Sequence, residues 1–341
     1  AMSKKTNAIA SLRSNPTLAL LVGILAVSLS AVVLSVFKIQ QNNSNIQRFL
    51  KESDDLRSAN YRLVDALRAS MDGNELSFDE MNETLTDMTD LAGELNGAKN
   101  KQLLDAMPAQ IASVRDVWDK FKLNTETVYK NKATVLLVHD LAGRLSQTIP
   151  QLQEEYDSIV QNLIRNGAPA AQVAEARAQS WRAERIARNI DKLLAGGDDA
   201  EAAADEFSAD ALMFGQVLNG MLVGDREIGI DRVFSPDVVQ TLNDAAELFK
   251  FVTESSASIA ASKDVFAVTR QAADNIKEVD SPALLQELSS INGTVSELPE
   301  ARKWNLAFLI AAGVSLFVMI AIAVMQLRAG GSRLHVQESE N

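Results

Sequence analysis

The chain has 341 residues and a formal net charge of −12, and 47% of its residues are hydrophobic although only 5% are aromatic. With 7 prolines and 16 glycines, it keeps long stretches that favour helices, so we expect an all-α fold packed through aliphatic side chains. The acidic balance argues against nucleic acid as a partner. Because no cysteine is present, disulfides and thiolate chemistry are excluded.

Two uncharged segments, Thr17–Phe37 and Trp304–Leu327, are long enough to cross a bilayer as helices. The first has an apolar run longer than that of a signal peptide, so we interpret it as a membrane anchor. Basic residues flank the segments on their outer sides: Lys4, Lys5 and Arg13 before the first, and Arg328 and Arg333 after the second. The positive-inside rule then predicts two transmembrane helices with both chain termini in the cytoplasm.

This topology divides the chain into five parts. They are a cytoplasmic N-terminus (1–16), transmembrane helix 1 (17–37), an outer domain (38–303), transmembrane helix 2 (304–327) and a cytoplasmic stub (328–341). The outer domain contains 28 of the 33 basic and 43 of the 45 acidic residues, so the acidic excess of the chain lies on this domain.

Turn-forming residues divide the outer domain into six predicted helices. The turns fall at 72–74, 97–100, 166–169, 196–199 and 220–236. The third helix is the longest, because apolar residues keep a 4-3 heptad spacing from Met107 to Leu163 with one shortened step at Lys132. At roughly 85 Å, this helix would be longer than one compact bundle.

The outer domain contains an internal duplication, with repeats at about 45–165 and 168–300. The offset is 131 residues for the long helices and 123 residues for the helices before them. The matched pairs include Met107 with Val238, Lys132 with Lys263, Arg62 with Arg185, and Gly73 with Gly196. These matches predict a bimodular domain of two stacked four-helix bundles that share the long third and sixth helices.

Several short motifs between about Val135 and Phe251 resemble one known family. They are Gln147-Thr148-Ile149-Pro150-Gln151-Leu152-Gln153, Asn166-Gly167-Ala168-Pro169, Ala183-Glu184-Arg185-Ile186 and Ala245-Ala246-Glu247-Leu248-Phe249. Together they resemble the N-terminal sensory region of PilJ-type type IV pilus chemoreceptors. The first repeat departs from the Leu-Arg-x-Leu-Ser-Gln-Arg-Ile pattern of that family, and only Leu56, Arg57 and Arg62 match it.

The resemblance implies a methyl-accepting transducer in the bacterial inner membrane, with its sensory domain in the periplasm, that controls twitching motility and surface sensing. It implies a homodimer surrounded by membrane lipid, with major pilin as a periplasmic partner. An output half would bind a cytoplasmic coupling protein and a histidine kinase. The chain ends shortly after Leu327, so we expect that output half to lie outside it.

Candidate catalytic groups are few. His139 and His335 are the only histidines, and the sequence contains neither a glycine-rich phosphate loop nor the spacing of paired metal ligands. We therefore expect no enzyme activity, no cofactor and no metal site. His139 lies beside the heptad stripe, and we interpret it as structural because a catalytic role would need convergent partners.

A basic stripe on the helix between 169 and 196 is the candidate binding site for an acidic ligand or a pilin carboxylate. It comprises Arg177, Arg182, Arg185 and Arg188 with Trp181 beside them, and the resemblance adds Arg62 from the first repeat. The alternative, which we favour, is a solvated face with partners one turn away, such as Glu184 for Arg188. Trp181 would then be a core residue.

Lys132 and Lys263 occupy equivalent core positions of the heptads, and Pro150 and Pro282 lie at nearly equivalent places. Burial of a lone ammonium is costly, so we expect the lysine side chains to reach the rim of the bundles. The functional alternative is a weak polar joint at which one bundle moves relative to the other, with the prolines as sites of helix kinks or starts.

Two other functions remain open from the sequence. The input domain of a sensor histidine kinase would have the same two transmembrane helices and a four-helix input. A non-signalling envelope scaffold would instead form a fixed stoichiometric complex, and the spacing between its transmembrane helices would not depend on a ligand.

Overall fold

The computed structural model of the chain describes residues 16–197 and 199–338. All regular secondary structure in these two ranges is helical, apart from one isolated antiparallel bridge between Asp225 and Ile230. The prediction of an all-α fold with an apolar helix near each end is therefore confirmed for this part of the chain. The basic residues Lys4, Lys5 and Arg13 lie outside the described residues.

The chain forms two compact units. Unit 1 combines Ala1–Leu56, Leu91–Ser113 and Glu287–Asn341, and unit 2 combines Arg57–Asp90 and Val114–Gln286. Four helices have residues in both units: α2 (Pro16–Met71), α3 (Glu75–Leu95), α5 (Pro108–Lys130) and α10 (Ser281–Ser296).

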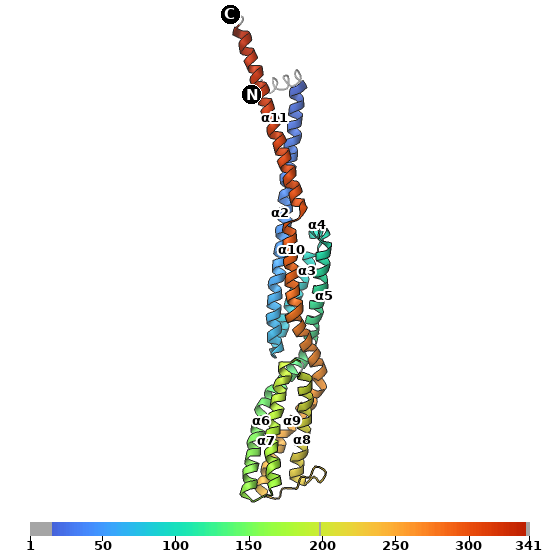
Figure 1. Ribbon diagram of the computed structural model, residues 1–341, viewed down its shortest axis with the longest axis vertical. Coiled ribbons are helices and arrows are strands. Elements are labelled where there is room, and N and C mark those ends of the chain that lie inside the picture. The colour runs from blue at the N-terminus through green and yellow to red at the C-terminus, as the bar shows by residue number, and fades with distance from the viewer. Residues whose placement is uncertain (1–15, 198, 339–341) are drawn as a thin grey trace. The chain divides into compact units, whose positions relative to one another are not determined.

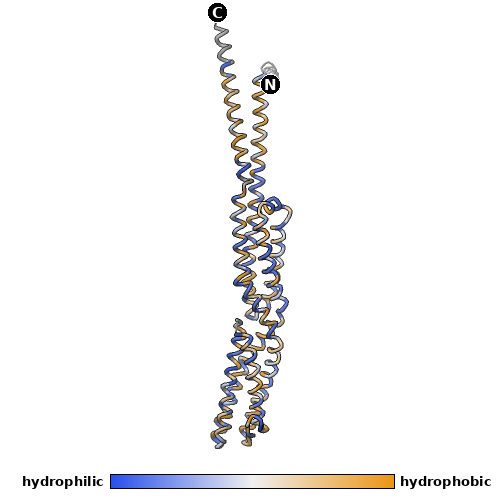
Figure 2. Tube along the Cα trace, turned by 45° about the vertical axis from the view of Figure 1, so that its right-hand side comes forward, coloured by the Kyte–Doolittle hydropathy of each residue, from blue (hydrophilic) through white to orange (hydrophobic). Residues whose placement is uncertain are grey.

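Unit 1 contains the two most apolar stretches of the chain, and Figure 2 shows their hydrophobic colouring. One lies in α2 (Pro16–Met71) and the other in α11 (Pro299–Glu338). In each helix an 18-residue window has a mean hydropathy of 2.7, and only 11% of the window is buried. Both helices are therefore long and apolar enough to cross a membrane.

A tight turn in unit 1 is hydrogen-bonded to α2. It consists of a 3-10 turn (Ala98–Asn100) followed by α4 (Lys101–Asp105). Asn100 is buried, and its amide nitrogen donates hydrogen bonds to Glu52 at 2.7 Å and to the Leu95 carbonyl at 3.1 Å. The turn after α3 is thereby anchored on α2.

In unit 2, four helices form the second bundle (Figure 1). They are α6 (Lys132–Arg165), α7 (Ala170–Ala195), α8 (Ala200–Val223) and α9 (Pro236–Asn275). α6 and α8 each contact both α7 and α9, as expected when consecutive antiparallel helices surround one core. Three buried rings meet in that core: Phe214 contacts Tyr156 edge to face, with ring centroids 5.2 Å apart, and stacks on Phe249 at 4.6 Å.

The first bundle in unit 2 consists of the end of α2, the start of α3 (Glu75–Leu95), α5 (Pro108–Lys130) and the segment that leads from α9 into α10 (Ser281–Ser296). Two side-chain hydrogen bonds cross its core. Asn60 of α2 donates to Ser281 at 2.7 Å, and Asn124 of α5 donates to Asp280 at 2.6 Å.

The two long helices are less regular than the heptad pattern predicts. The third predicted helix is broken at Asn131, next to the shortened step, so that α5 and α6 are separate helices. The sixth predicted helix contains a five-residue π turn, Ile276–Asp280, and ends at Ser296, before α11 begins. A π turn holds one extra residue, and this explains why Ile276 and Leu284 are both fully buried although they are eight positions apart rather than seven.

Candidate functional site

Arg185, at the centre of the predicted basic stripe, is paired within the fold. Its Nε donates to Oδ2 of Asp210 at 2.9 Å, and its Nη2 donates to the other carboxylate oxygen. Asp210, on the neighbouring helix α8, is 4% exposed, and the hydrogen bond to it raises the pKa of Arg185. The guanidinium also lies over the ring of Trp181, 4.8 Å from its centroid. Much of the charge of Arg185 is therefore satisfied by α8.

The other stripe residues are more accessible. Arg182 donates to the buried Gln179 at 2.7 Å, and Arg188 forms a loose pair with Glu184 at 3.7 Å on the exposed surface of α7. Arg177 is exposed. Trp181 is 54% exposed, so the expectation that it belongs to the core is wrong.

Arg62 does not join this cluster, because it lies on α2 in the first bundle, where it is exposed. The repeats explain the difference. In the structure α3 and α8 match at an offset of 126 residues rather than 123, because Asp79 and Asp205 pair with the equivalent lysines Lys132 and Lys263. At that offset the buried Thr84 of α3 occupies the place of the buried Asp210 in α8, so the first repeat has no carboxylate at the position that binds Arg185 in the second.

Lys132 and Lys263 make equivalent ion pairs. Lys132 lies 3.0 Å from Asp79 of α3, and Lys263 lies 2.6 Å from Asp205 of α8. About a quarter of each lysine side chain is exposed, 23% and 26%, so both reach the rim between helices. The hydrogen bond to the aspartate raises the pKa of each lysine. Lys132 is the first residue after the break at Asn131, whereas Lys263 lies within the continuous helix α9.

The two prolines have different surroundings. Pro150 lies inside α6, which stays α-helical around it. Pro282 lies two residues after the end of the π turn, at the second position of α10. Since proline has no amide hydrogen and crowds the carbonyl four residues earlier, it favours a widened turn just before it. Pro150 shows that a proline alone is not sufficient for this.

The ends of two equivalent helices are capped by side chains from the long helices. Nε2 of His139, on α6, lies 2.8 Å from the carbonyl oxygen of Met71 at the end of α2. Arg270, on α9, donates to the carbonyl oxygen of Ala195 at the end of α7 at 2.5 Å. His139 and Arg270 are 131 residues apart, which is the repeat offset. His139 therefore links the second bundle to the first, and the sequence analysis missed this link because the pairing of the two caps is visible only in three dimensions.

A glycine follows each capped helix end. Gly73 has φ +87°, and a Cβ placed on it would lie 2.8 Å from the imidazole of His139. Gly196 has φ +76°, and its Cβ would lie 2.7 Å from the guanidinium of Arg270. Both the backbone conformation and the close approach of the cap therefore require glycine at these positions.

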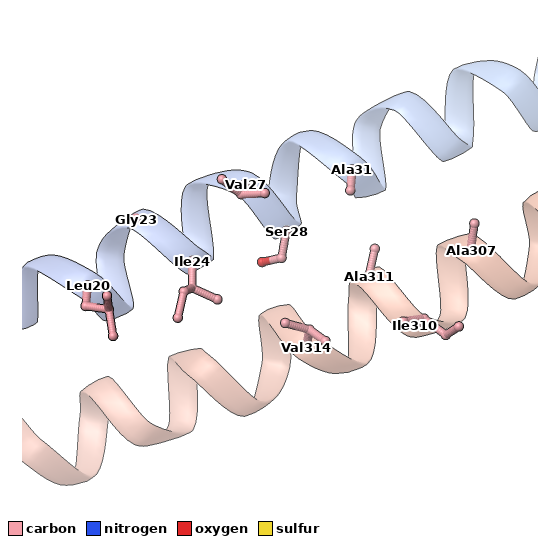
Figure 3. Close-up of a pocket in the computed structure, with 10 residues that line it drawn as sticks. All are labelled: Leu20, Gly23, Ile24, Val27, Ser28, Ala31, Ala307, Ile310, Ala311 and Val314. Carbon is pink, nitrogen blue, oxygen red and sulfur yellow. The ribbon is translucent and has the colours of Figure 1, made fainter. Parts of the chain in front are cut away.

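The two apolar helices of unit 1 meet at a pair of buried serines. Oγ of Ser315 in α11 lies 2.8 Å from Oγ of Ser28 in α2. Each hydroxyl also has a carbonyl in its own helix, Leu25 for Ser28 at 3.1 Å and Ala311 for Ser315 at 2.9 Å. Figure 3 shows the groove of about 750 Å³ beside this contact, lined mainly by small and aliphatic side chains.

A second hollow, of about 610 Å³, lies where the α6–α7 and α8–α9 loops meet. Gln172 reaches across it and donates to the Asp231 carbonyl at 3.3 Å, and Asn166 donates to Ser235 at 2.6 Å. Phe234 lines the hollow with 79% of its surface exposed. Within residues 16–197 and 199–338, no group of three or more histidines or carboxylates is arranged to hold a metal ion.

Comparison with known proteins found two relatives and no matching family model. A protein of Alcanivorax borkumensis named for methyl-accepting chemotaxis, AlkN, is 37% identical over 249 residues, which are 72% of this chain and 36% of that protein. Protein PilJ of Pseudomonas aeruginosa is 33% identical over 347 residues, which cover 99% of this chain and 51% of PilJ. The chain thus spans about half, or less, of the length of these relatives.

Proposed function

Because this chain is homologous over nearly its whole length to half of a PilJ-type methyl-accepting chemoreceptor, we propose that it is the sensory part of a transducer for type IV pilus motility and surface sensing. The alignment with PilJ over 99% of the chain is the observation that carries this proposal. The two apolar helices fit a protein that crosses the inner membrane twice.

The proposed topology places the region between the apolar helices in the periplasm and both termini in the cytoplasm. The basic flanks of the two apolar segments support it, since cytoplasmic flanks of membrane helices are enriched in lysine and arginine. The strongly acidic balance of the region between them is compatible with an outer domain that avoids the anionic inner leaflet.

The proposed signal is a small displacement of the helix that contains Trp304–Leu327 relative to α2. Supporting this, α2 is one uninterrupted helix from Pro16 to Met71 and can carry a displacement along its axis. The second connection, which runs from α9 through α10 to α11, is interrupted by the π turn and by Glu297 and Leu298. It can therefore bend while α2 remains one continuous helix.

The proposed partners follow from the family. They are a second copy of the chain, major pilin outside the membrane, and a coupling protein with a histidine kinase on the cytoplasmic side. Exposed arginines of α7, Arg177 and Arg188, are the proposed contacts for an acidic partner, with Trp181 beside them. Arg185 contributes less because Asp210 already binds it.

The test is a distance measurement with spin labels on cysteines placed at Lys38 and Arg302, which are unique labelling sites because the chain has no cysteine. The bilayer-embedded protein is measured with and without purified major pilin. We expect pilin to bind and to shift the distance by about 1–2 Å, the scale of helix shifts in switching proteins.

Arg177→Glu combined with Arg188→Glu is the matched variant and should weaken the pilin effect while leaving the free protein unchanged. An unaltered distance in a complex that does form would contradict the helix displacement. Absence of pilin binding would contradict pilin as the stimulus. A fixed complex with other envelope proteins and an unaltered distance would favour the scaffold function.

A further inference from the structure

The contact between His139 and the end of α2 joins two bundles through a single titratable side chain. His139 belongs to α6 of the second bundle, and its acceptor, the Met71 carbonyl, ends the α2 helix of the first. Because a carbonyl oxygen only accepts, Nε2 must donate, and the neutral ring then has its proton on Nε2. Gly73 packs against the same ring at a distance that leaves no room for a Cβ.

Charged groups surround this contact on both packed elements. α2 and the turn after it contribute Arg68 and Asp72, α9 contributes Arg270 and Asp274, and the π turn contributes Lys277. With Met71 and others they line a cavity of about 170 Å³ at the end of α2. Water can therefore reach the junction if the contact between imidazole and carbonyl opens.

We propose that His139 makes this junction a pH-sensitive joint, closed while the imidazole is neutral and released when it is protonated in an acidified periplasm. In the closed state a second proton would bind Nδ1 and leave the hydrogen bond from Nε2 to Met71 in place, but it would put a positive charge in a partly buried site that the guanidinium of Arg270 repels. In the open state the same charge would be hydrated. Proton binding therefore favours the open state by linkage.

The pKa of His139 agrees with this direction. Burial lowers it from the ordinary value of 6.5, and Arg270 lowers it further, while the Met71 carbonyl and Asp72 oppose the shift. A group with a lowered pKa stabilises the closed state fully above its ordinary pKa. That contribution is lost as the pH falls from 6.5 through the lowered value, so acidification opens the joint.

The repeat provides a comparison inside the same molecule. Arg270 caps α7 at the place equivalent to His139, but its guanidinium keeps its charge at every physiological pH. The cap within the second bundle is therefore permanent, whereas the cap between the bundles is titratable. The joint itself does not depend on the proposed function, but its use in signalling does.

The test uses the full chain in lipid bilayers, with spin labels on cysteines at Leu76 of α3 and Leu137 of α6, which are both exposed. We expect the distance distribution to lengthen or broaden as the pH is lowered from 8 to 5, with a midpoint below 6.5. His139→Gln keeps a donor that does not titrate and should remove the response. His335→Gln, at the only other histidine, is the control and should leave it intact.

Two charge variants test the environment of the ring. Arg270→Gln should move the midpoint to higher pH, and Asp72→Asn should move it to lower pH. A distribution that is the same at pH 8 and pH 5, or a response that persists in His139→Gln, would overturn the proposal. If Arg270→Gln loosens the second bundle, Asp72→Asn still tests the predicted direction, and an unmoved or raised midpoint there would count against it.

Discussion

At the scale of single residues, the pair of Arg185 and Asp210 shows how burial determines which ion pairs contribute to the stability of the fold. The Asp210 side chain is 5% exposed, so its carboxylate depends on the guanidinium, whereas Arg185 itself is 41% exposed. Replacing Arg185 by methionine should lower the free energy of unfolding by about 2 kcal/mol, because a buried carboxylate loses charged hydrogen bonds but water reaches it in part. Arg188→Met, at an exposed pair, should cost less than about 0.5 kcal/mol. Urea denaturation of both variants measures the difference, and equal losses would contradict this account.

The sequence predicted these residues only in part. The basic stripe and the partner of Arg188 can be read from helical spacing, since residues one turn apart must be neighbours. The partner of Arg185 lies on another helix 25 residues away, and nothing in the local pattern identifies it. Asn60 was not predicted as a core residue, although its place as a polar residue inside the apolar stripe between Leu56 and Leu63 could have indicated it, and it is fully buried in the structure.

At the scale of helices, the π turn before Pro282 yields the clearest test. Deleting Val279, which is 60% exposed, restores the seven-residue spacing between Ile276 and Leu284, so the chain should fold with a regular helix and no loss of thermal stability. The control is deletion of Val268, which is 58% exposed within the regular helix α9. That deletion moves the buried positions out of register and should cost at least about 4 kcal/mol. Thermal unfolding followed by circular dichroism distinguishes the two, and similar destabilisation by both would show that the π turn is not an inserted residue.

Helix boundaries could be predicted where a loop connects two helices, but less well where a long helix is only locally irregular. Four of the five predicted turns in the outer domain begin within two residues of a helix end, since glycine, asparagine and proline favour turns strongly, whereas the turn predicted from residue 220 begins inside α8, which continues to Val223. The break at Asn131 was visible only as a shortened heptad step, and the π turn as one extra residue between buried positions. Each of these irregularities changes the spacing between successive core residues by a single residue. Whether the backbone responds with a break or with a π turn then depends on the packing of the four helices.

At the scale of the whole molecule, the ion pairs of Lys132 and Lys263 test whether these lysines form a weak polar joint at which one bundle moves relative to the other. Replacing Lys132 and Lys263 together by leucine should raise the melting temperature by a few degrees, because apolar side chains replace largely buried lysine side chains whose aspartate partners are well exposed. The same double variant should weaken the pilin-dependent change between labels at residues 38 and 302. Lys120→Leu, at a surface pair with Asp116, is the control and should leave that change intact. A full response in the double variant would mean that the lysines only fill space at the rim.

The contact between Ser28 and Ser315 has a mechanical consequence. In the membrane interior a hydroxyl left without an acceptor is costly, yet Ser28 donates to the Leu25 carbonyl and only accepts from Ser315, and Ser315 can donate to the Ala311 carbonyl instead. Separation of the two helices therefore loses one hydrogen bond and leaves both serine hydroxyls with a carbonyl acceptor in their own helices. The contact is therefore weak and reversible. It favours one relative position of the two helices, allows a small displacement under a modest force, and forms again when the force is removed.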